Sequence, residues 1–123
     1  MKGITYIIVC IVLNVIGQSS IKYGTRVVGE LSLQFSKFGS FLITVLKQPF
    51  ILFGLALYVI GSFFWIGALS KTDLSFAYPA LSVGYVFILL ISWKFFGETI
   101  NIYRILGMVL IVAGMVFLAK SVN

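Results

Sequence analysis

The sequence contains no histidine, a single cysteine, two prolines and only three acidic residues. Without histidine it lacks the side chain that most often serves as a general base near neutral pH and that most often ligates transition metals. Cys10 on its own can form neither an intrachain disulfide nor a thiolate metal site. These absences argue against an enzyme, and we expect no catalytic residue, no metal and no cofactor.

Charged residues make up only 10% of the 123 residues, whereas 61% are hydrophobic. A soluble domain has about 25% charged residues because most of its surface faces water. The composition therefore excludes a soluble globular domain and indicates a chain surrounded by lipid. A net charge of +6 would suggest a nucleic-acid partner in a soluble protein. Here the basic residues lie at the ends of apolar segments, which is typical of membrane topology, so we expect no nucleic acid.

Four apolar segments are each long enough to cross a bilayer, which takes about 20 helical residues. We place the spans at about residues 4–22, 49–69, 74–96 and 102–119. Pro49 suits a first helical turn, and Asn101 suits an N-cap. The sequence predicts an all-α membrane protein with a single domain, residues 1–123, built as a bundle of four transmembrane helices.

The connection between the first two spans is long enough to contain another helix. Apolar residues recur there at helical spacing, namely Leu31, Phe35, Phe38, Leu42 and Val45. Polar residues fill the opposite side, so the pattern predicts an amphipathic helix that lies in the membrane interface between helices 1 and 2. Its role is either a surface anchor, which we favour, or a lateral gate.

The basic residues are unevenly divided between the two ends of the predicted spans. Six lie in the first and third connections: Lys22, Arg26, Lys37, Lys47, Lys94 and Arg104. The termini and the middle connection hold the other three. The positive-inside rule then places the larger set in the cytoplasm and both termini outside. Because the margin is small, insertion in both orientations is the alternative.

Polar side chains recur along one face of each of the first three predicted helices. The sets are Asn14 and Gln18, then Tyr58, Ser62 and Trp65, then Tyr78, Ser82 and Tyr85. Their spacing of three and four residues aligns each set along its helix. Hydrogen bonds between helices explain any one such residue, but three aligned sets favour a shared groove that binds substrate. Pro79 should kink the third helix beside this groove and act as a hinge.

The fourth predicted helix has no polar side chain between residues 107 and 118. Gly107, Ile111 and Gly114 form a seam on which another helix can pack closely. The seam either packs within the chain or joins two subunits. Since four helices of this size enclose little volume, we expect a homodimer or a heterodimer with a related small subunit.

Three motifs follow one another in the second half of the chain. They are Ala77-Tyr78-Pro79-Ala80-Leu81-Ser82, Trp93-Lys94-Phe95-Phe96-Gly97-Glu98, and the pair Gly107 and Gly114. Together with four short spans, they resemble the small multidrug resistance fold of the drug/metabolite transporter superfamily over nearly the whole chain. Gly17-Gln18 with Lys22, Tyr85-Val86, and Lys94 with Glu98 are most similar to the small flippase subunits for aminoarabinose linked to undecaprenyl phosphate.

The resemblance implies a flippase that moves a polyprenyl-phosphate-linked sugar across the bacterial cytoplasmic membrane, with the bilayer and the lipid-linked sugar as its partners. Proton-coupled exporters of this fold carry a membrane-embedded Glu where the register places Asn14, and an aromatic residue where Leu81 stands. Asn cannot titrate, so proton coupling lacks a carrier at that position. An exporter of small cationic or hydrophobic compounds is therefore the alternative, and a purely structural subunit is a third possibility.

Three basic residues on one side of the membrane are candidates for binding the phosphate: Lys22, Lys94 and Arg104. The alternative is that these charges only set the topology. Lys94 interrupts the apolar run of residues 91–96, where topology alone does not require a charge. Glu98 follows Lys94 by four residues, and we expect it to neutralise Lys94 when no ligand is bound.

Overall fold

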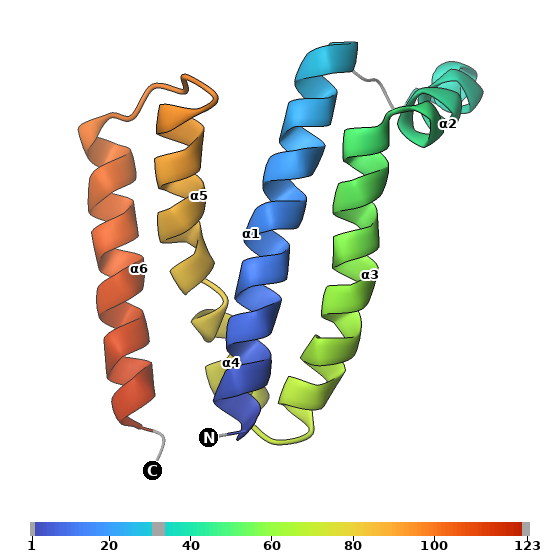
Figure 1. Ribbon diagram of the computed structural model, residues 1–123. Helices are drawn as coiled ribbons and strands as arrows, with labels where there is room; N and C mark the ends of the chain where they lie inside the picture. The colour runs from blue at the N-terminus through green and yellow to red at the C-terminus, as the bar shows by residue number, and fades with distance from the viewer. Residues whose placement is uncertain (1, 31–33, 122–123) are drawn as a thin grey trace.

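The computed structural model describes residues 2–30 and 34–121, and over these residues it is helical with no strand (Figure 1). The helices are α1 (Lys2–Val28), α2 (Phe38–Lys47), α3 (Pro49–Leu69), α4 (Leu74–Ala80), α5 (Val83–Lys94) and α6 (Ile102–Lys120), with the 3₁₀ helix η1 (Phe35–Lys37) directly before α2. By length and composition, α1, α3, the α4–α5 segment and α6 are each able to cross a membrane. The predicted all-α membrane fold is confirmed.

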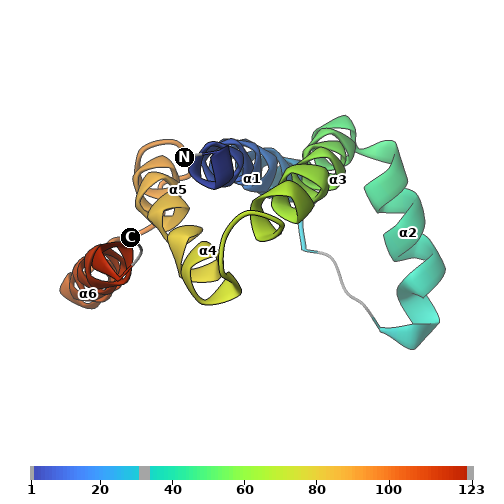
Figure 2. The same ribbon diagram turned by 90° about the horizontal axis from the view of Figure 1, so that it is seen from below.

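The helices that span the membrane stand in a curved row, in the order α6, α5, α1, α3 (Figures 1 and 2). Both chain ends lie at the lower ends of the spanning helices in Figure 1, and α2 lies near their upper ends, beside α3. The α1–α3 pair has the most extensive contact, whereas α6 touches only α4 and α5 to any extent. The fold is thus an open row around α1 and not a closed bundle.

Two glycines set where the predicted spans end. The first helix continues past the predicted residue 22 to Val28, because nothing interrupts it before Gly29, whose φ of +86° favours glycine. The third span ends at Lys94, two residues before the predicted end. Gly97, at φ +65°, then turns the chain toward α6. The fourth span begins as predicted, since Asn101 Oδ1 accepts a hydrogen bond from the Arg104 N–H at 3.0 Å.

Glycines also allow α1 and α3 to approach closely. A Cβ built on Gly17 would lie 3.1 Å from the Gly54 carbonyl oxygen, and one built on Gly54 would lie 2.6 Å from the Gly17 carbonyl oxygen. The two backbones are therefore in direct contact, as in other small-residue contacts between membrane helices. Ser20 adds a hydrogen bond across the pair, from its Oγ to the Phe50 carbonyl oxygen at 2.5 Å.

The third span is interrupted at Leu81 and Ser82, between α4 and α5 (Figure 1). Pro79 has no N–H to donate to the turn before it, and the backbone switches to bonds between residues three apart. These include Leu81 N to the Tyr78 carbonyl oxygen at 3.2 Å and Ser82 N to the Pro79 carbonyl oxygen at 2.9 Å. The predicted kink at Pro79 is confirmed, and it takes the form of a break.

The amphipathic helix α2 lies across the end of α3, outside the row of spanning helices (Figure 2). It follows η1 directly, and Leu31, the first residue of the predicted pattern, lies outside the described residues. Phe38 and Leu42 remain exposed, as does Leu46, while Lys37 and Lys47 bracket the helix. An exposed apolar face with basic ends fits a helix in the membrane interface.

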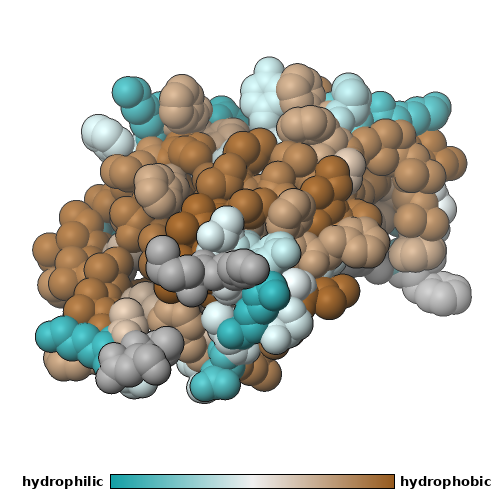
Figure 3. Space-filling model, turned by 60° about the horizontal axis from the view of Figure 1, so that its bottom comes forward, coloured by the Kyte–Doolittle hydropathy of each residue, from teal (hydrophilic) through white to brown (hydrophobic). Residues whose placement is uncertain are grey.

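The buried core is small and lies toward the ends of the spanning helices that carry the two chain termini. Ile7, Ala68, Ala77, Ala80 and Met115 form its cluster. Most large apolar side chains of the described residues instead face outward. Figure 3 shows apolar side chains over most of one face, with polar ones at its margins. Such a surface is stable in lipid and not in water.

Candidate functional site

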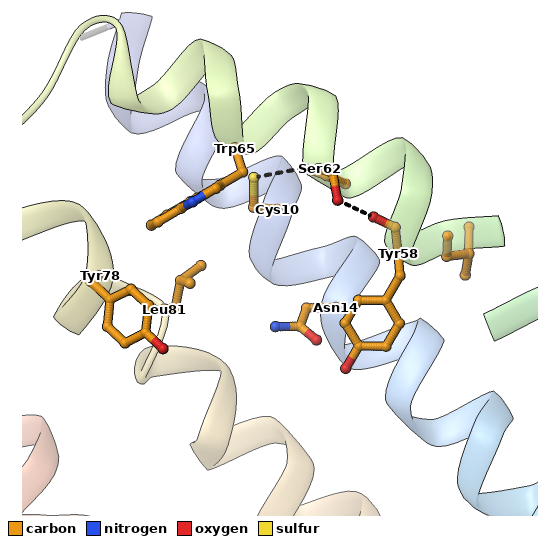
Figure 4. Close-up of a pocket in the computed structure, with 9 residues that line it drawn as sticks. Cys10, Asn14, Tyr58, Ser62, Trp65, Tyr78 and Leu81 are labelled. Atoms are coloured by element: carbon orange, nitrogen blue, oxygen red, sulfur yellow. Dashed lines mark hydrogen bonds between the residues drawn. The ribbon is translucent and has the colours of Figure 1, made fainter. Parts of the chain in front are cut away.

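A cavity of about 190 Å³ lies between α1, α3 and the break in the third span (Figure 4). Its lining residues are Cys10, Asn14, Leu57, Tyr58, Gly61, Ser62, Trp65, Tyr78 and Leu81. We call it the aromatic cavity because three aromatic rings line it. Five of the eight residues predicted to line a groove come together here, from three spanning segments.

The polar atoms of the aromatic cavity differ in whether they already have partners. Ser62 Oγ donates to the Tyr58 carbonyl oxygen at 2.9 Å, and Cys10 Sγ donates to the Gly61 carbonyl oxygen at 3.5 Å (Figure 4). Asn14 Oδ1 is buried and, within the described part of the chain, has no hydrogen-bond partner. An unpaired buried acceptor is costly, so a ligand with an O–H or N–H group would find a ready partner in Asn14.

Trp65 and Tyr78 form an aromatic wall on one side of this cavity. Their rings meet edge to face, with centroids 6.1 Å apart. Trp65 belongs to α3 and Tyr78 to α4, so the contact joins the two segments that flank the middle connection. Rings in this arrangement can bind an apolar sugar face or a cation.

A second cavity, of about 340 Å³, lies between the second half of α1 and α5. Its lining residues are Gln18, Ser19, Lys22, Tyr85, Ile88, Ile91, Ser92, Phe96 and Glu98. We call it the charged cavity because Lys22 and Glu98 both line it. Gln18, which lines this cavity, also lies near Tyr58 of the aromatic cavity. The polar face of α1 therefore serves both cavities.

A constriction of about 10 Å³ separates the two cavities. It is lined by Ile11, Asn14, Val15, Leu81, Gly84, Tyr85 and Ile88. Asn14 and Leu81 are shared with the aromatic cavity, and Tyr85 and Ile88 with the charged cavity. Where the sequence predicts one groove, the structure has two cavities in line along α1. The space between them holds about one water molecule.

The acidic side chain of the charged cavity pairs with a different base from the one predicted. Glu98 Oε1 lies 3.9 Å from Arg104 Nη1, which also donates to the Thr99 carbonyl oxygen at 2.8 Å. No Lys94–Glu98 ion pair occurs among residues 34–121. The spacing of four residues pairs side chains only along a continuous helix. Since α5 ends at Lys94, Glu98 lies near Arg104 in this structure, and its pairing with Lys94 stays a prediction.

The remaining basic residues lie around the charged cavity in different ways. Lys22 lines it directly. Arg26, which follows one helical turn later, holds its guanidinium carbon 5.7 Å from the ring centroid of Phe96, a lining residue. Lys94 is exposed and lines none of the three cavities.

Several predicted residues lie apart from the cavities, and several lining residues were not predicted. Ser82 lies in the break and lines none of the three cavities, while Gly107, Ile111 and Gly114 lie along α6. The unpredicted lining residues of the aromatic cavity are Cys10, Leu57, Gly61 and Leu81. These are apolar or small, so no polar pattern could have identified them. In the charged cavity two signals were available: Ser19 adjoins Gln18, and Ser92 follows Tyr85 by seven residues on the same helix.

Residues 2–30 and 34–121 contain no group of three or more His, Cys, Asp or Glu side chains that could hold a metal ion.

Four membrane-crossing segments with polar cavities along their shared face define a small multi-pass membrane transporter. Comparison with known proteins gives the family. Residues 31–120 match the EamA-like transporter family, and the chain belongs to it. It is accordingly a multi-pass protein of the bacterial inner membrane.

Its curated relatives include subunits named as flippases. The chain is 30% identical over 122 residues to a probable 4-amino-4-deoxy-L-arabinose-phosphoundecaprenol flippase subunit ArnF of Aeromonas hydrophila, covering 94% of this chain and 78% of that protein. It is 38% identical over 62 residues to the corresponding probable subunit ArnE of Klebsiella pneumoniae, covering 50% of this chain and 55% of the relative. The ArnE match thus spans about half of each protein. No solved structure matches the chain.

Proposed function

We propose that this protein is a subunit of a flippase that moves a polyprenyl-phosphate-linked sugar between the leaflets of the membrane. The observation that carries the proposal is the pair of cavities along α1, one aromatic and polar, the other lined by Lys22. A glycosyl phosphate has the same two parts, a ring with hydroxyl groups and an anion. The names of the ArnF and ArnE relatives support the same class of substrate.

The phosphate binds at the charged cavity in this proposal. Lys22 lines the cavity and is the primary contact, and Arg26 lies one helical turn further along α1. Arg104 reaches the same cavity through its pairing with Glu98 and becomes available when the phosphate displaces that carboxylate. Lys94 attracts the anion from outside the cavity. A basic cluster facing the anionic cytoplasmic leaflet favours this end as the entry side.

The sugar moves along the polar face of α1 while the lipid tail stays in the bilayer. Gln18 and Tyr85 line the charged cavity, where the ring enters. Trp65 and Tyr78 then offer an aromatic wall, and Asn14 Oδ1 accepts a hydrogen bond from a hydroxyl or amino group. Tyr58 and Ser62 complete the lining, and the break beside Pro79 supplies the hinge. No covalent chemistry is required.

Matched lysine substitutions at the two ends of the molecule test this function. In cells whose only copy is the variant, Lys22→Gln should reduce the amount of lipid-linked sugar in the outer leaflet at least about tenfold, because hydrogen bonds to a charged group contribute about 1.5–3 kcal/mol. Outer-leaflet sugar is measured in spheroplasts with periodate, which does not cross the membrane. Lys71→Gln, at the end opposite to Lys22, is the control. Equal outer-leaflet sugar in the two variants, at equal protein levels, refutes the phosphate site.

We further propose that a second small subunit, either identical or related, packs on the α6 seam of Gly107, Ile111 and Gly114. A Cβ at either glycine would meet no atom of the described residues within 4 Å, so the seam has room for another helix. In an otherwise cysteine-free Cys10→Ser background, Ile111→Cys should form an intersubunit disulfide in membranes. Val109→Cys, on the same helix and also exposed, is the control. Equal crosslinking at both positions contradicts a specific seam.

Export of small cations is the second candidate function. The observation in its favour is the aromatic cavity, whose three rings could hold a cation over their faces. Deletion of the gene should then increase sensitivity to quaternary ammonium compounds and leave the outer-leaflet sugar unchanged, which is the opposite of the flippase result.

A further inference from the structure

One apolar side chain of the break in the third span lines the constriction between the two cavities. Leu81 lines both the aromatic cavity and the constriction. The opposite wall is α1, through Ile11, Asn14 and Val15. With a free volume of about 10 Å³, the constriction admits about one water molecule and no sugar ring. A polar headgroup therefore cannot pass through the constriction in this conformation.

The backbone on the α5 side of Leu81 is held firmly against α1. Gly84 is buried, and a Cβ on it would lie 3.3 Å from Ile11 Cγ2 and 3.4 Å from Val15 Cγ2. At these distances α1 and α5 are closely packed around Gly84, with no free space between them. Widening the constriction by moving α5 would disturb this packing, whereas moving the Leu81 side chain would not.

Leu81 itself lies where the regular helical hydrogen bonding of the third span is interrupted. It is the first residue of the break between α4 and α5, with its N–H on the Tyr78 carbonyl oxygen and its carbonyl oxygen accepting from the Gly84 N–H at 3.0 Å. Both bonds span three residues, and Pro79 supplies no N–H nearby. If the angle between α4 and α5 changed at this break, the Leu81 side chain would move, while the hydrogen bonds within the long helices would remain.

We propose that Leu81 is the gate of the passage and the residue that determines which headgroup can move between the cavities. The inference rests on the proposed function, because it assigns the gate to the route taken by the sugar. When Leu81 lies across the passage, the two cavities are separate. When the break bends, Leu81 leaves the passage, and Asn14 and Tyr85, which flank it, contact the headgroup.

The only cysteine of the sequence makes the gate measurable without any transport assay. Cys10 lines the aromatic cavity, beyond the constriction as seen from Lys22. A membrane-impermeant cationic methanethiosulfonate is added to sealed vesicles on the Lys22 side only. That side is identified with Lys37→Cys in a Cys10→Ser background. The rate of Cys10 modification, relative to that in protein unfolded in dodecyl sulfate, reports whether the passage is open.

Leu81→Ala should increase this rate at least about tenfold, because the shortened side chain leaves its former volume empty. Leu81→Met, of similar volume, should keep the wild-type rate. Leu57→Ala enlarges the aromatic cavity without widening the constriction, so its rate of Cys10 modification should also equal that of the wild type. Leu81→Trp should decrease both the modification rate and the amount of outer-leaflet sugar.

The outcomes separate the gate from the proposed function. Fast Cys10 modification in the wild-type protein, or equal rates for Leu81→Ala and Leu57→Ala, overturns the gate. If the modification rates follow the expectation but no Leu81 variant changes outer-leaflet sugar, the gate holds and the flippase proposal fails. Elution of each variant from size exclusion in detergent as the wild-type species verifies that the comparison is between folded proteins.

Discussion

A methyl group added to Gly54 has no room in the contact between α1 and α3. Its Cβ would lie 2.6 Å from the Gly17 carbonyl oxygen and 2.5 Å from Ile21 Cγ1. The isoleucine can rotate, but the carbonyl oxygen belongs to the backbone of α1 and cannot. To restore an ordinary contact of 3.4 Å, the two backbones must separate by about 0.8 Å at this point. Gly54→Ala should therefore weaken the most extensive helix contact in the fold.

Gly61→Ala is a matched control on the same helix, two turns further along α3. Its Cβ would meet Leu13 Cβ at 3.8 Å and Leu13 Cδ1 at 3.9 Å, both ordinary contacts. Exchange of glycine for alanine raises helix propensity by about 1 kcal/mol in either place, so this gain cancels in the comparison. Overpacking costs about 1–3 kcal/mol. Gly54→Ala should have a free energy of unfolding lower than that of Gly61→Ala by this amount.

The measurement is unfolding in mixed micelles with increasing dodecyl sulfate, followed by circular dichroism and, in a Trp93→Phe background, by the fluorescence of Trp65 on α3. The difference between the two variants is read from their transition midpoints at equal slopes. Gly61→Ala should be at least as stable as the wild type. If both variants unfold at the same midpoint, the backbones of α1 and α3 are not in contact at Gly17 and Gly54, and the packing described above is incorrect.

Two further predictions concern the charged cavity and α2. Glu98→Gln should tighten the binding of inorganic phosphate about two- to fivefold, because it removes a negative charge from the cavity that Lys22 lines and releases Arg104. The dissociation constant is measured by titration followed by ³¹P NMR, and weaker binding in the variant contradicts the prediction. In a Cys10→Ser background, a nitroxide spin label attached at Leu42→Cys should be relaxed more strongly by oxygen dissolved in the lipid than a label attached at Ser40→Cys, on the polar face of α2. Equal relaxation of the two labels excludes an interfacial helix.

The spanning segments could be predicted from the sequence because lipid imposes a simple rule on them. A helix must be apolar over about 20 residues to cross the bilayer, and polar residues on it then stand out. Asn14, Tyr58 and Trp65 were identified in this way, and the structure brings them to one cavity. The apolar lining residues Cys10 and Leu57 carry no such signal, because lipid-facing and cavity-facing residues of this kind look alike in a sequence.

The division of the groove into two cavities could not be predicted, because it depends on the break in the third span. An unbroken helix would keep Tyr78, Ser82 and Tyr85 on one line. The break instead places Tyr78 in the aromatic cavity and Tyr85 in the charged one, and it brings Leu81 between them. Pro79 predicts a kink, but the direction of the kink depends on the packing of Gly84 against α1.

Helix α6 is poorly packed within one chain, and the proposed assembly accounts for this. Within Ile102–Lys120 only Met115 is buried, and Gly107 and Gly114 have open space where a side chain would be. A glycine inside a helix costs about 1 kcal/mol relative to alanine. In α1 and α3 that cost is offset by close packing, at Gly17 and Gly54, whereas on α6 no contact within residues 2–30 and 34–121 offsets it. A second subunit seated on the seam would supply the missing contact. It would also give α6, the most loosely attached spanning helix of the row, a partner on its open side.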